Sequence, residues 1–421
     1  MIFLIVFATL ILGIGMITYT KKYIGTSANY IIFFNLLWMV GSILTSLGLY
    51  DSFVPPLKIY LYIFFMLLTF NVTTVILAST STSLKEYSLN DESKFIITDK
   101  KKSRVLLVIL IALIVLIFPT FIQSVSYIMS NGFGELRSEV LTSKSLVQWI
   151  LYHYGHPLIL AIMVISTVDV IFYRKNFMVY SIGLICVIMY ITIFASRWIL
   201  AECILMLVLC LLQKYGNKLT DIIKNNKKIA LLLLVGLSLL IYITSQRSLH
   251  EASILENIYY YFFGSIDLLG IFSHNLHQYT FNYDYLYGQA FFSGVVGVFA
   301  DILRLLLGIN INTGIVYINE VVQGYEYVSP TIRMNNNVTM LYAFISDFGW
   351  FGLIIFPSLI AVFCFKFYKK AVMKTTKLNL AIYVYTFSIL LFCIIEWFPG
   401  RATTILTFVF IYLLAGKKIR V

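Results

Sequence analysis

Charged residues are scarce in this chain. Asp, Glu, Lys and Arg make up 12% of its 421 residues, whereas hydrophobic residues make up 60%. Soluble domains carry about 25% charged residues, so the composition excludes an ordinary soluble protein. The apolar runs are long and do not alternate with polar residues, which favours spanning helices over a β-barrel. We therefore expect an all-α polytopic membrane protein whose first partner is the lipid bilayer.

The chain also lacks the residue patterns of metal and nucleotide chemistry. Its five cysteines all lie inside apolar runs, with no Cys-x-x-Cys motif, so we expect them to pack as small apolar residues. The Walker A, Gly-x-Ser-x-Gly and His-Glu-x-x-His motifs are absent. His153 and His156 can share a helix face, but no third ligand accompanies them at a typical spacing. We predict no metal site and no cofactor.

Apolar runs long enough to cross a membrane recur along the whole chain, which we predict to be one integral membrane domain, 1–421. A hydrocarbon core of ~30 Å needs about 20 apolar residues. The predicted spans cover residues 2–19, 28–50, 59–79, 105–127, 148–173, 177–195, 198–212, 229–245, 348–367, 379–397 and 402–416. Most of the basic residues lie in every second gap between them. This positive-inside pattern predicts an N-terminus outside and a C-terminus in the cytoplasm. The net charge of +12 therefore reflects topology, and we expect no nucleic-acid partner.

The gap 246–346 is the longest and contains no lysine, so we expect a large, late extracytoplasmic loop. Two apolar stretches lie within it, at 257–272 and 289–307. They form short helices that lie on the membrane or dip into it, or else two further crossings. The sequence thus predicts about eleven spans, with thirteen as the alternative.

Four arginines lie at the predicted outer ends of helices. They are Arg197, Arg247, Arg333 and Arg401, the last of which closes a tight turn that Glu396 precedes. Ion pairing and snorkelling at helix ends is one explanation. The other is an anion site, because guanidinium groups match phosphate oxygens and the outer side otherwise avoids basic residues.

Two further residues are candidates for a general base, and a third is an acid with a structural explanation. His250 and Glu251 lie three and four residues after Arg247, so one of them can act as a general base; otherwise they are exposed loop residues. Asp169 lies near Arg174 at the inner end of its span, which an interfacial ion pair explains.

The stretch 328–352 resembles a segment of the bacterial oligosaccharide repeat-unit polymerases (Wzy-type O-antigen or capsule polymerases). The matching residues are Asn337, Val338, Thr339, Tyr342, Asp347, Phe348, Gly349 and Gly352. Upstream, the aromatic run from Tyr259 to Gly264, which leads to Asp267, is similar to the stretch that opens this family's large external loop.

The resemblance implies a GT-C-like glycosyltransferase architecture in the bacterial cytoplasmic membrane. It implies polymerisation of undecaprenyl-pyrophosphate-linked oligosaccharide on the outer face by metal-independent glycosyl transfer. A flippase and a chain-length regulator are the partners that the family implies. The alternatives are an O-antigen-type glycan ligase, a flippase or transporter of the lipid-linked unit, and a membrane scaffold.

The resemblance also assigns expected roles within the site. The four arginines would bind the pyrophosphate, and Asp347, His250 or Glu251 would take the acceptor's proton. Tyr260, Tyr342 and Asn337 would contact sugar, although aromatic residues also anchor proteins at membrane interfaces. Asp347 has a second interpretation, as a structural cap at the start of its helix.

Overall fold

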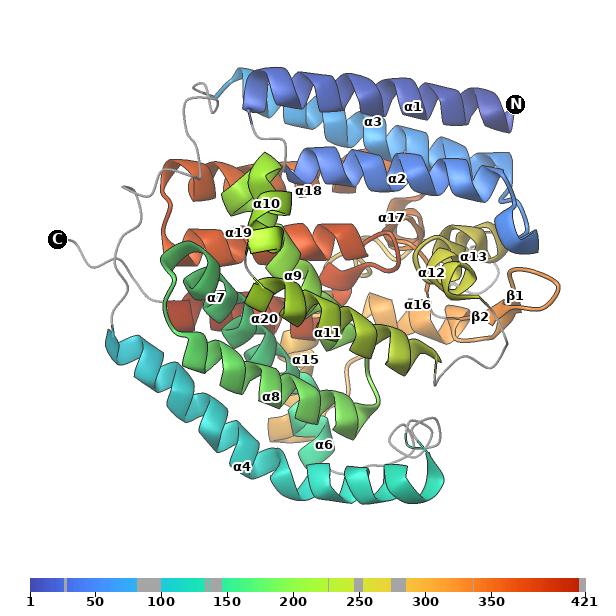
Figure 1. Ribbon diagram of the computed structural model, residues 1–421. Helices are drawn as coiled ribbons and strands as arrows, with labels where there is room; N and C mark the ends of the chain where they lie inside the picture. The colour runs from blue at the N-terminus through green and yellow to red at the C-terminus, as the bar shows by residue number, and fades with distance from the viewer. Residues whose placement is uncertain are drawn as a thin grey trace. The chain divides into compact units, whose positions relative to one another are not determined.

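The computed structural model shows a predominantly α-helical chain (Figure 1). It describes residues 1–25, 29–81, 100–132, 136, 146–225, 227–245, 253–273, 285–335 and 337–415. Arg247, His250 and Glu251 lie outside these ranges.

Helices of membrane-spanning length and composition confirm the expected all-α membrane protein. In the described ranges, seven are long and apolar enough to cross a bilayer: Ile2–Ile24, Leu57–Ser79, Ser103–Asn131, Leu146–Tyr173, Phe177–Phe194, Trp198–Tyr215 and Met340–Met373. Four shorter apolar helices cover Tyr30–Ser46, Leu231–Thr244, Lys377–Phe392 and Ala402–Ala415. Each predicted span overlaps one of these helices. The number of crossings and the orientation of the termini stay predictions.

The chain is divided into two compact units. The first contains Met1–Ser88, Ala252–Lys369 and Ile389–Ile405, and the second contains Leu89–Glu251, Lys370–Ser388 and Leu406–Val421. Three helices contribute residues to both: α18 (Gly352–Met373), α19 (Lys377–Phe392) and α20 (Ala402–Ala415). Both units therefore combine distant parts of the sequence. That the chain forms one integral membrane domain stays a prediction.

The first unit begins with three apolar helices, α1 (Ile2–Tyr19), α2 (Tyr30–Ser46) and α3 (Leu57–Ser79). α1 packs along both others (Figure 1). The side-chain amides of Asn35 on α2 and Asn71 on α3 exchange two hydrogen bonds of 3.0 and 2.8 Å. Paired amides satisfy each other's donors and acceptors, so polar residues are accommodated in an apolar helix contact.

The same unit holds the described parts of the long loop. They form α12 (Ile254–Phe262), α13 (Gly264–Phe272), α15 (Ser293–Leu307), α16 (Gly314–Val322), a hairpin of β1 (Glu326–Tyr327) and β2 (Arg333–Met334), and α17 (Met340–Phe348). α13 is almost wholly buried and packs against α2 and α3, whereas α15 exposes an apolar side. The two apolar stretches of the loop thus form short helices.

Between α17 and α18, the family-like segment has two glycines at positions where a side chain would not fit the backbone conformation or the available space. Gly349 has φ 55° and ψ −134°, a conformation that residues with a side chain rarely adopt. At Gly352, a Cβ atom would lie 2.0 Å from the carbonyl oxygen of Phe344. The break at 349 ends α17 just after Asp347, so this residue lies at the end of a helix. The sequence had placed it at a helix start.

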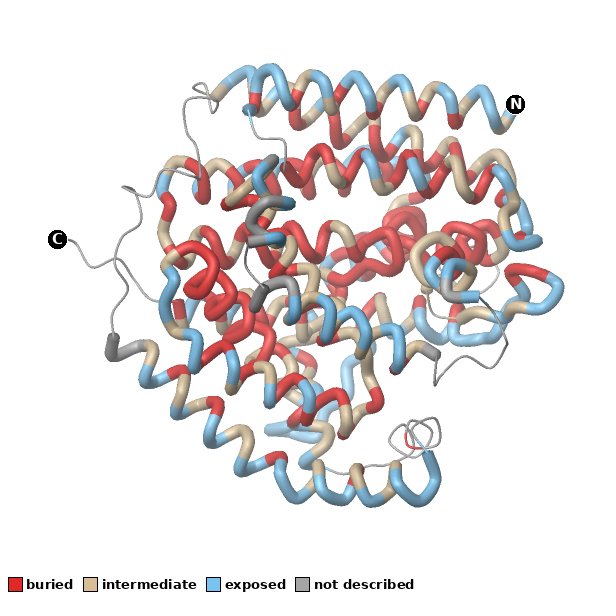
Figure 2. Tube along the Cα trace, in the orientation of Figure 1, coloured by how far each residue is buried: buried red, intermediate tan, exposed pale blue. Residues whose placement is uncertain are grey.

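The second unit is built around α7 (His156–Tyr173), which is buried along nearly its whole length (Figure 2). α7 packs against α8 (Phe177–Phe194) and α9 (Trp198–Tyr215). α4 (Lys100–Asn131) covers α8, and α11 (Lys227–Ser245) packs on α9. The remaining short helices of this unit's described residues are α6 (Leu146–Ile150), η5 (Leu151–Gly155), η6 (Gly216–Lys218) and α10 (Leu219–Asn225).

Candidate functional site

The turn between α19 and α20 carries an acid and an arginine held together. α19 ends at Phe392, earlier than the predicted limit of 397, and a 3₁₀ turn, η8 (Phe398–Gly400), follows. Just past this end, the carbonyl oxygens of Cys393 and Ile394 accept hydrogen bonds from the Met340 amide and the Ser265 hydroxyl. Glu396 consequently lies in the turn, five residues from Arg401.

The ion pair of this turn is bidentate. The Nε of Arg401 donates to Oε1 of Glu396 at 2.7 Å, and a terminal guanidinium nitrogen donates to Oε2. The side chain of Glu396 is 10% exposed and that of Arg401 is 31% exposed. The guanidinium also lies over the ring of Phe398, 4.6 Å from its centroid. Fork-shaped pairing of this kind fixes the plane of the carboxylate.

Glu396 lines a small cavity in the first unit. The other lining residues are Ile315, Ile318, Asn319, Val338, Thr339, Tyr342, Ala343 and Trp397. The cavity has a volume of about 10 Å³, close to the least that holds one water molecule. Tyr342 is buried, and its hydroxyl has no hydrogen-bond partner among the described residues. Asn319 is exposed, so the cavity is bounded there by a residue that faces outward from the protein.

The predicted sugar-contacting residues differ in their surroundings. Tyr342 lines the cavity, and Asn337 is half-buried two residues before Thr339, which accepts a hydrogen bond from the Leu341 amide as the N-cap of α17. Tyr260 is buried, and its hydroxyl donates to the carbonyl oxygen of Tyr50 at 2.7 Å. Burial raises the pKa of Tyr260. Its geometry is therefore that of a packed, hydrogen-bonded tyrosine.

Asp347, a predicted base, is engaged by the backbone. It is fully buried, and its two carboxylate oxygens accept hydrogen bonds from the amides of Ala290 at 2.9 Å and Phe291 at 2.8 Å. Its carbonyl oxygen accepts a further bond from the amide of Tyr287. These contacts favour the structural interpretation, except that Asp347 caps the turn before α15 and not its own helix.

Asp347 thereby supports the wall of the cavity indirectly. Phe291, whose amide it binds, stacks on Phe356 with centroids 4.1 Å apart and on Trp397 at 4.8 Å. The indole of Trp397 donates back to the carbonyl oxygen of Phe291 at 3.1 Å. Since Trp397 directly follows Glu396, this aromatic stack positions the acid.

The predicted arginines that the structure describes have different surroundings. Arg333 is exposed on β2; its guanidinium lies 4.2 Å from the ring centroid of Tyr327 and donates to that hydroxyl. Arg401 holds Glu396. Arg197 belongs to the second unit, where it is the N-cap residue of α9. Arg247, together with the predicted bases His250 and Glu251, lies outside the described residues.

A second buried acid in the first unit was singled out only through the resemblance. Asp267 on α13 is buried, and one of its carboxylate oxygens lies 3.5 Å from the hydroxyl of Tyr259. That hydroxyl is in turn 2.8 Å from the hydroxyl of Ser52. The other oxygen of Asp267 has no partner among the described residues. Burial raises the pKa of Asp267 well above its ordinary value.

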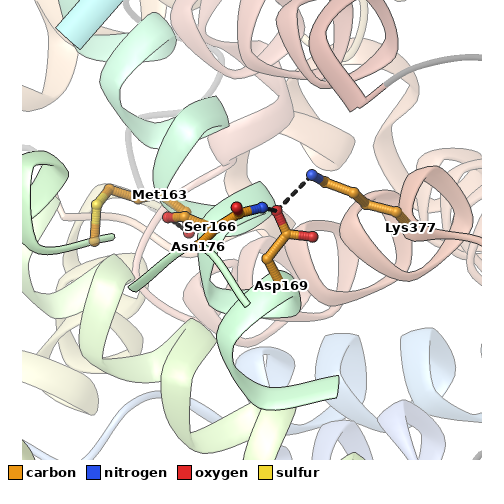
Figure 3. Close-up of polar contacts among 5 residues, drawn as sticks. All are labelled: Met163, Ser166, Asp169, Asn176 and Lys377. Atoms are coloured by element: carbon orange, nitrogen blue, oxygen red, sulfur yellow. Dashed lines mark hydrogen bonds and ion pairs between the residues drawn. The ribbon is translucent and has the colours of Figure 1, made fainter. Parts of the chain in front are cut away.

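The second unit contains a polar cluster whose partner differs from the expected one. Asp169 pairs with Lys377 at 2.5 Å and accepts a hydrogen bond from Asn176 at 2.7 Å (Figure 3). Arg174, the expected partner, is exposed and has φ 52° at the end of α7. The expectation of an ion pair is confirmed, but its cation comes from a residue 208 positions away.

No protein-family model, curated protein or solved structure matches this chain. Within the described ranges, no group of three or more His, Cys, Asp or Glu side chains is arranged to hold a metal ion. The functional interpretation therefore depends on the chemistry of the residues themselves and on the resemblance of the 328–352 segment.

Proposed function

We propose that this chain is a glycosyltransferase of the bacterial cytoplasmic membrane that polymerises lipid-linked oligosaccharide repeat units into a surface polysaccharide. A hydroxyl of the incoming unit attacks the anomeric carbon of the growing glycan. The bond from that carbon to undecaprenyl pyrophosphate breaks, and the pyrophosphate leaves with the bonding electron pair.

One observation carries the proposal. Val338, Thr339 and Tyr342, which belong to the family-like segment, line the same cavity as Glu396, the partner of Arg401. A buried carboxylate, an arginine and a tyrosine hydroxyl that has no partner among the described residues are thus gathered beside the segment on which the resemblance rests. Groups of these kinds serve proton transfer and the stabilisation of developing negative charge.

The pyrophosphate would be recognised by arginine. Arg333 is exposed, and stacking on Tyr327 pre-orients its guanidinium for a bidentate contact with phosphate oxygens. Arg401 already has a carboxylate partner, which an arriving phosphate would share or displace. Arg197 and Arg247 stay predicted contacts.

The proposal is tested with purified protein in lipid nanodiscs and a chemically defined undecaprenyl-pyrophosphate-linked repeat unit. Without nucleotide sugar or added metal, we expect a ladder of glycan lengths. The Arg333→Gln variant should slow ladder formation about 10- to 100-fold, the equivalent of a lost charge-assisted hydrogen bond of about 1.5–3 kcal/mol. Arg174→Gln, which removes an exposed arginine of the second unit, is the matched control and should keep the wild-type rate.

Two results would contradict the polymerase. Movement of the intact lipid-linked unit across liposomes without any ladder would indicate a transporter. Transfer of a finished glycan to a different acceptor, with no growth of chain length, would indicate a ligase.

A further inference from the structure

Glu396 is the carboxylate best placed for proton transfer in the cavity. Of the residues that line the cavity in the described chain, it alone is acidic. Asp347 uses both of its carboxylate oxygens to hold backbone amides, and Asp267 does not line the cavity. Among the described acids, the structure therefore distinguishes Glu396 from Asp347 and Asp267.

The ion pair with Arg401 leaves Glu396 able to accept a further bond. Each carboxylate oxygen takes one donor from the guanidinium, and a carboxylate has about four acceptor sites. Glu396 is thus a fixed carboxylate with acceptor capacity at the edge of a cavity.

Tyr342 supplies the second half of the arrangement. It is 1% exposed, and its hydroxyl is unpartnered among the described residues. Buried hydroxyl groups are nearly always hydrogen-bonded, so one without a partner indicates a place for a water molecule or a ligand group. The cavity of about 10 Å³ admits a single oxygen-sized group and no sugar ring.

We propose that the cavity binds the nucleophilic hydroxyl of the acceptor sugar, with Glu396 as its proton acceptor. This inference depends on the proposed polymerase function. Tyr342 holds the hydroxyl oxygen by a hydrogen bond, and Arg401 is a positioning residue that fixes the plane of the Glu396 carboxylate. The sugar ring stays outside, on the side of the exposed Asn319.

The proposed step moves one proton and one electron pair. The acceptor oxygen forms the bond to the anomeric carbon while its proton moves to Glu396. The bond between that carbon and the pyrophosphate oxygen breaks, and its electron pair leaves with the pyrophosphate. Glu396 then releases the proton to water before the next cycle.

The test compares Glu396→Gln with wild type in single-turnover ladder formation across pH, alongside a separate binding assay with a fluorescent lipid-linked repeat unit. Glutamine keeps the shape of the side chain but cannot accept the proton. We expect the rate to fall about 10²- to 10⁴-fold, the usual contribution of general acid–base catalysis, with binding unchanged. The fall in the wild-type rate on acidification should disappear in the variant. Glu320→Gln, which alters an exposed acid on α16 outside the cavity, should match wild type.

The outcomes separate the two proposals. If wild type makes no ladder from an authentic substrate, the polymerase proposal fails. If wild type makes the ladder and Glu396→Gln keeps the same rate and pH profile, the role of Glu396 is overturned and the polymerase stands. Should Glu396→Gln fail to fold, Tyr342→Phe tests the assignment instead, because it removes only a hydroxyl that has no partner among the described residues. We expect that variant to fold and to lose about tenfold in rate, the value of one hydrogen bond of about 1.4 kcal/mol; an unchanged rate would refute the assignment.

Discussion

The two compact units each contain an acid paired with a base, and the pairs are built in opposite ways. In the first unit, Glu396 and Arg401 are five residues apart on one turn, and the arginine side chain is 31% exposed beside a cavity. In the second, Asp169 and Lys377 are 208 residues apart, with side chains 0% and 8% exposed. A local pair on a turn orders few residues, whereas a distant buried pair joins two helices.

The two carboxylates also differ in what surrounds them. Asp169 accepts bonds from Lys377 and Asn176, and all three residues lie near helix ends, so these bonds connect the ends of different helices. Nearby, the Lys214 ammonium donates to the carbonyl oxygen of Ile171 at 2.6 Å, in the last turn of α7, where the helix dipole favours a cation. Glu396 instead lines a cavity together with Tyr342, whose hydroxyl has no hydrogen-bond partner among the described residues. The comparison indicates a structural pair in the second unit and a functional pair in the first.

Breaking the structural pair should have the largest effect on stability. Lys377→Ala leaves the Asp169 carboxylate buried without its cation, which typically costs about 3–5 kcal/mol. We expect a markedly lower apparent melting temperature in detergent, measured by intrinsic fluorescence. Lys374→Ala, which removes an exposed lysine of the same segment, should melt like wild type.

The neutral double variant Asp169→Asn/Lys377→Met sharpens this expectation. Replacing both charges removes the uncompensated carboxylate, so most of the lost stability should return. Ladder formation should stay at the wild-type rate in the double variant. A double variant as unstable as Lys377→Ala would show that the ion pair does not determine the loss.

The helices of both units were predictable, because each apolar run of membrane length overlaps an observed helix. The ends were less so: the predicted span 379–397 continues past Phe392, where the structure has already entered the turn. Arg401 lies close to Glu396 in sequence, so that contact could be anticipated. The partner of Asp169 could not, since Lys377 joins it only through helix packing, and the nearby Arg174 offered a false candidate.

The engagement of Asp347 shows a second limit of sequence reasoning. Its partners are backbone amides of Ala290 and Phe291, which are 57 and 56 residues away. Every residue except proline has such a donor, so no side-chain pattern marks these positions. A carboxylate that binds distant backbone therefore resembles a catalytic acid until the fold is known.

Asp267 is a buried acid with no cationic partner among the described residues, and its effect on stability should depend on pH. Burial raises its pKa in the folded state well above the ordinary value. The folded protein therefore holds this proton more tightly than the unfolded chain, and stability falls as pH rises above the unfolded value of about 4, by up to about 1.4 kcal/mol for each pH unit, until the folded pKa is reached. Asp267→Asn removes the ionisation, so its melting temperature should exceed that of wild type by a margin that grows with pH.

The matched control for this series is Asp51→Asn, which alters an exposed acid of the same unit and should leave the pH dependence unchanged. Melting curves of wild type and Asp267→Asn that run parallel from pH 5 to pH 8 would show that the Asp267 proton does not contribute to folding.

The smallest effect on stability is expected at the functional pair, where the effect on activity should be large. Arg401→Gln leaves the carboxylate of Glu396 without its cation. Because this pair is partly exposed, the loss in free energy of unfolding should be about 1–2 kcal/mol, between the values for an exposed and a buried pair. The neutral double variant Glu396→Gln/Arg401→Gln should recover that stability and still form the ladder about 10²- to 10⁴-fold more slowly than wild type, because none of the described residues that line the cavity then carries a carboxylate. Neutralising both charges should restore stability at either pair, but only at Asp169 and Lys377 should it also spare activity. If both double variants formed the ladder at the wild-type rate, both pairs would be structural. The catalytic carboxylate would then have to be another residue of the chain.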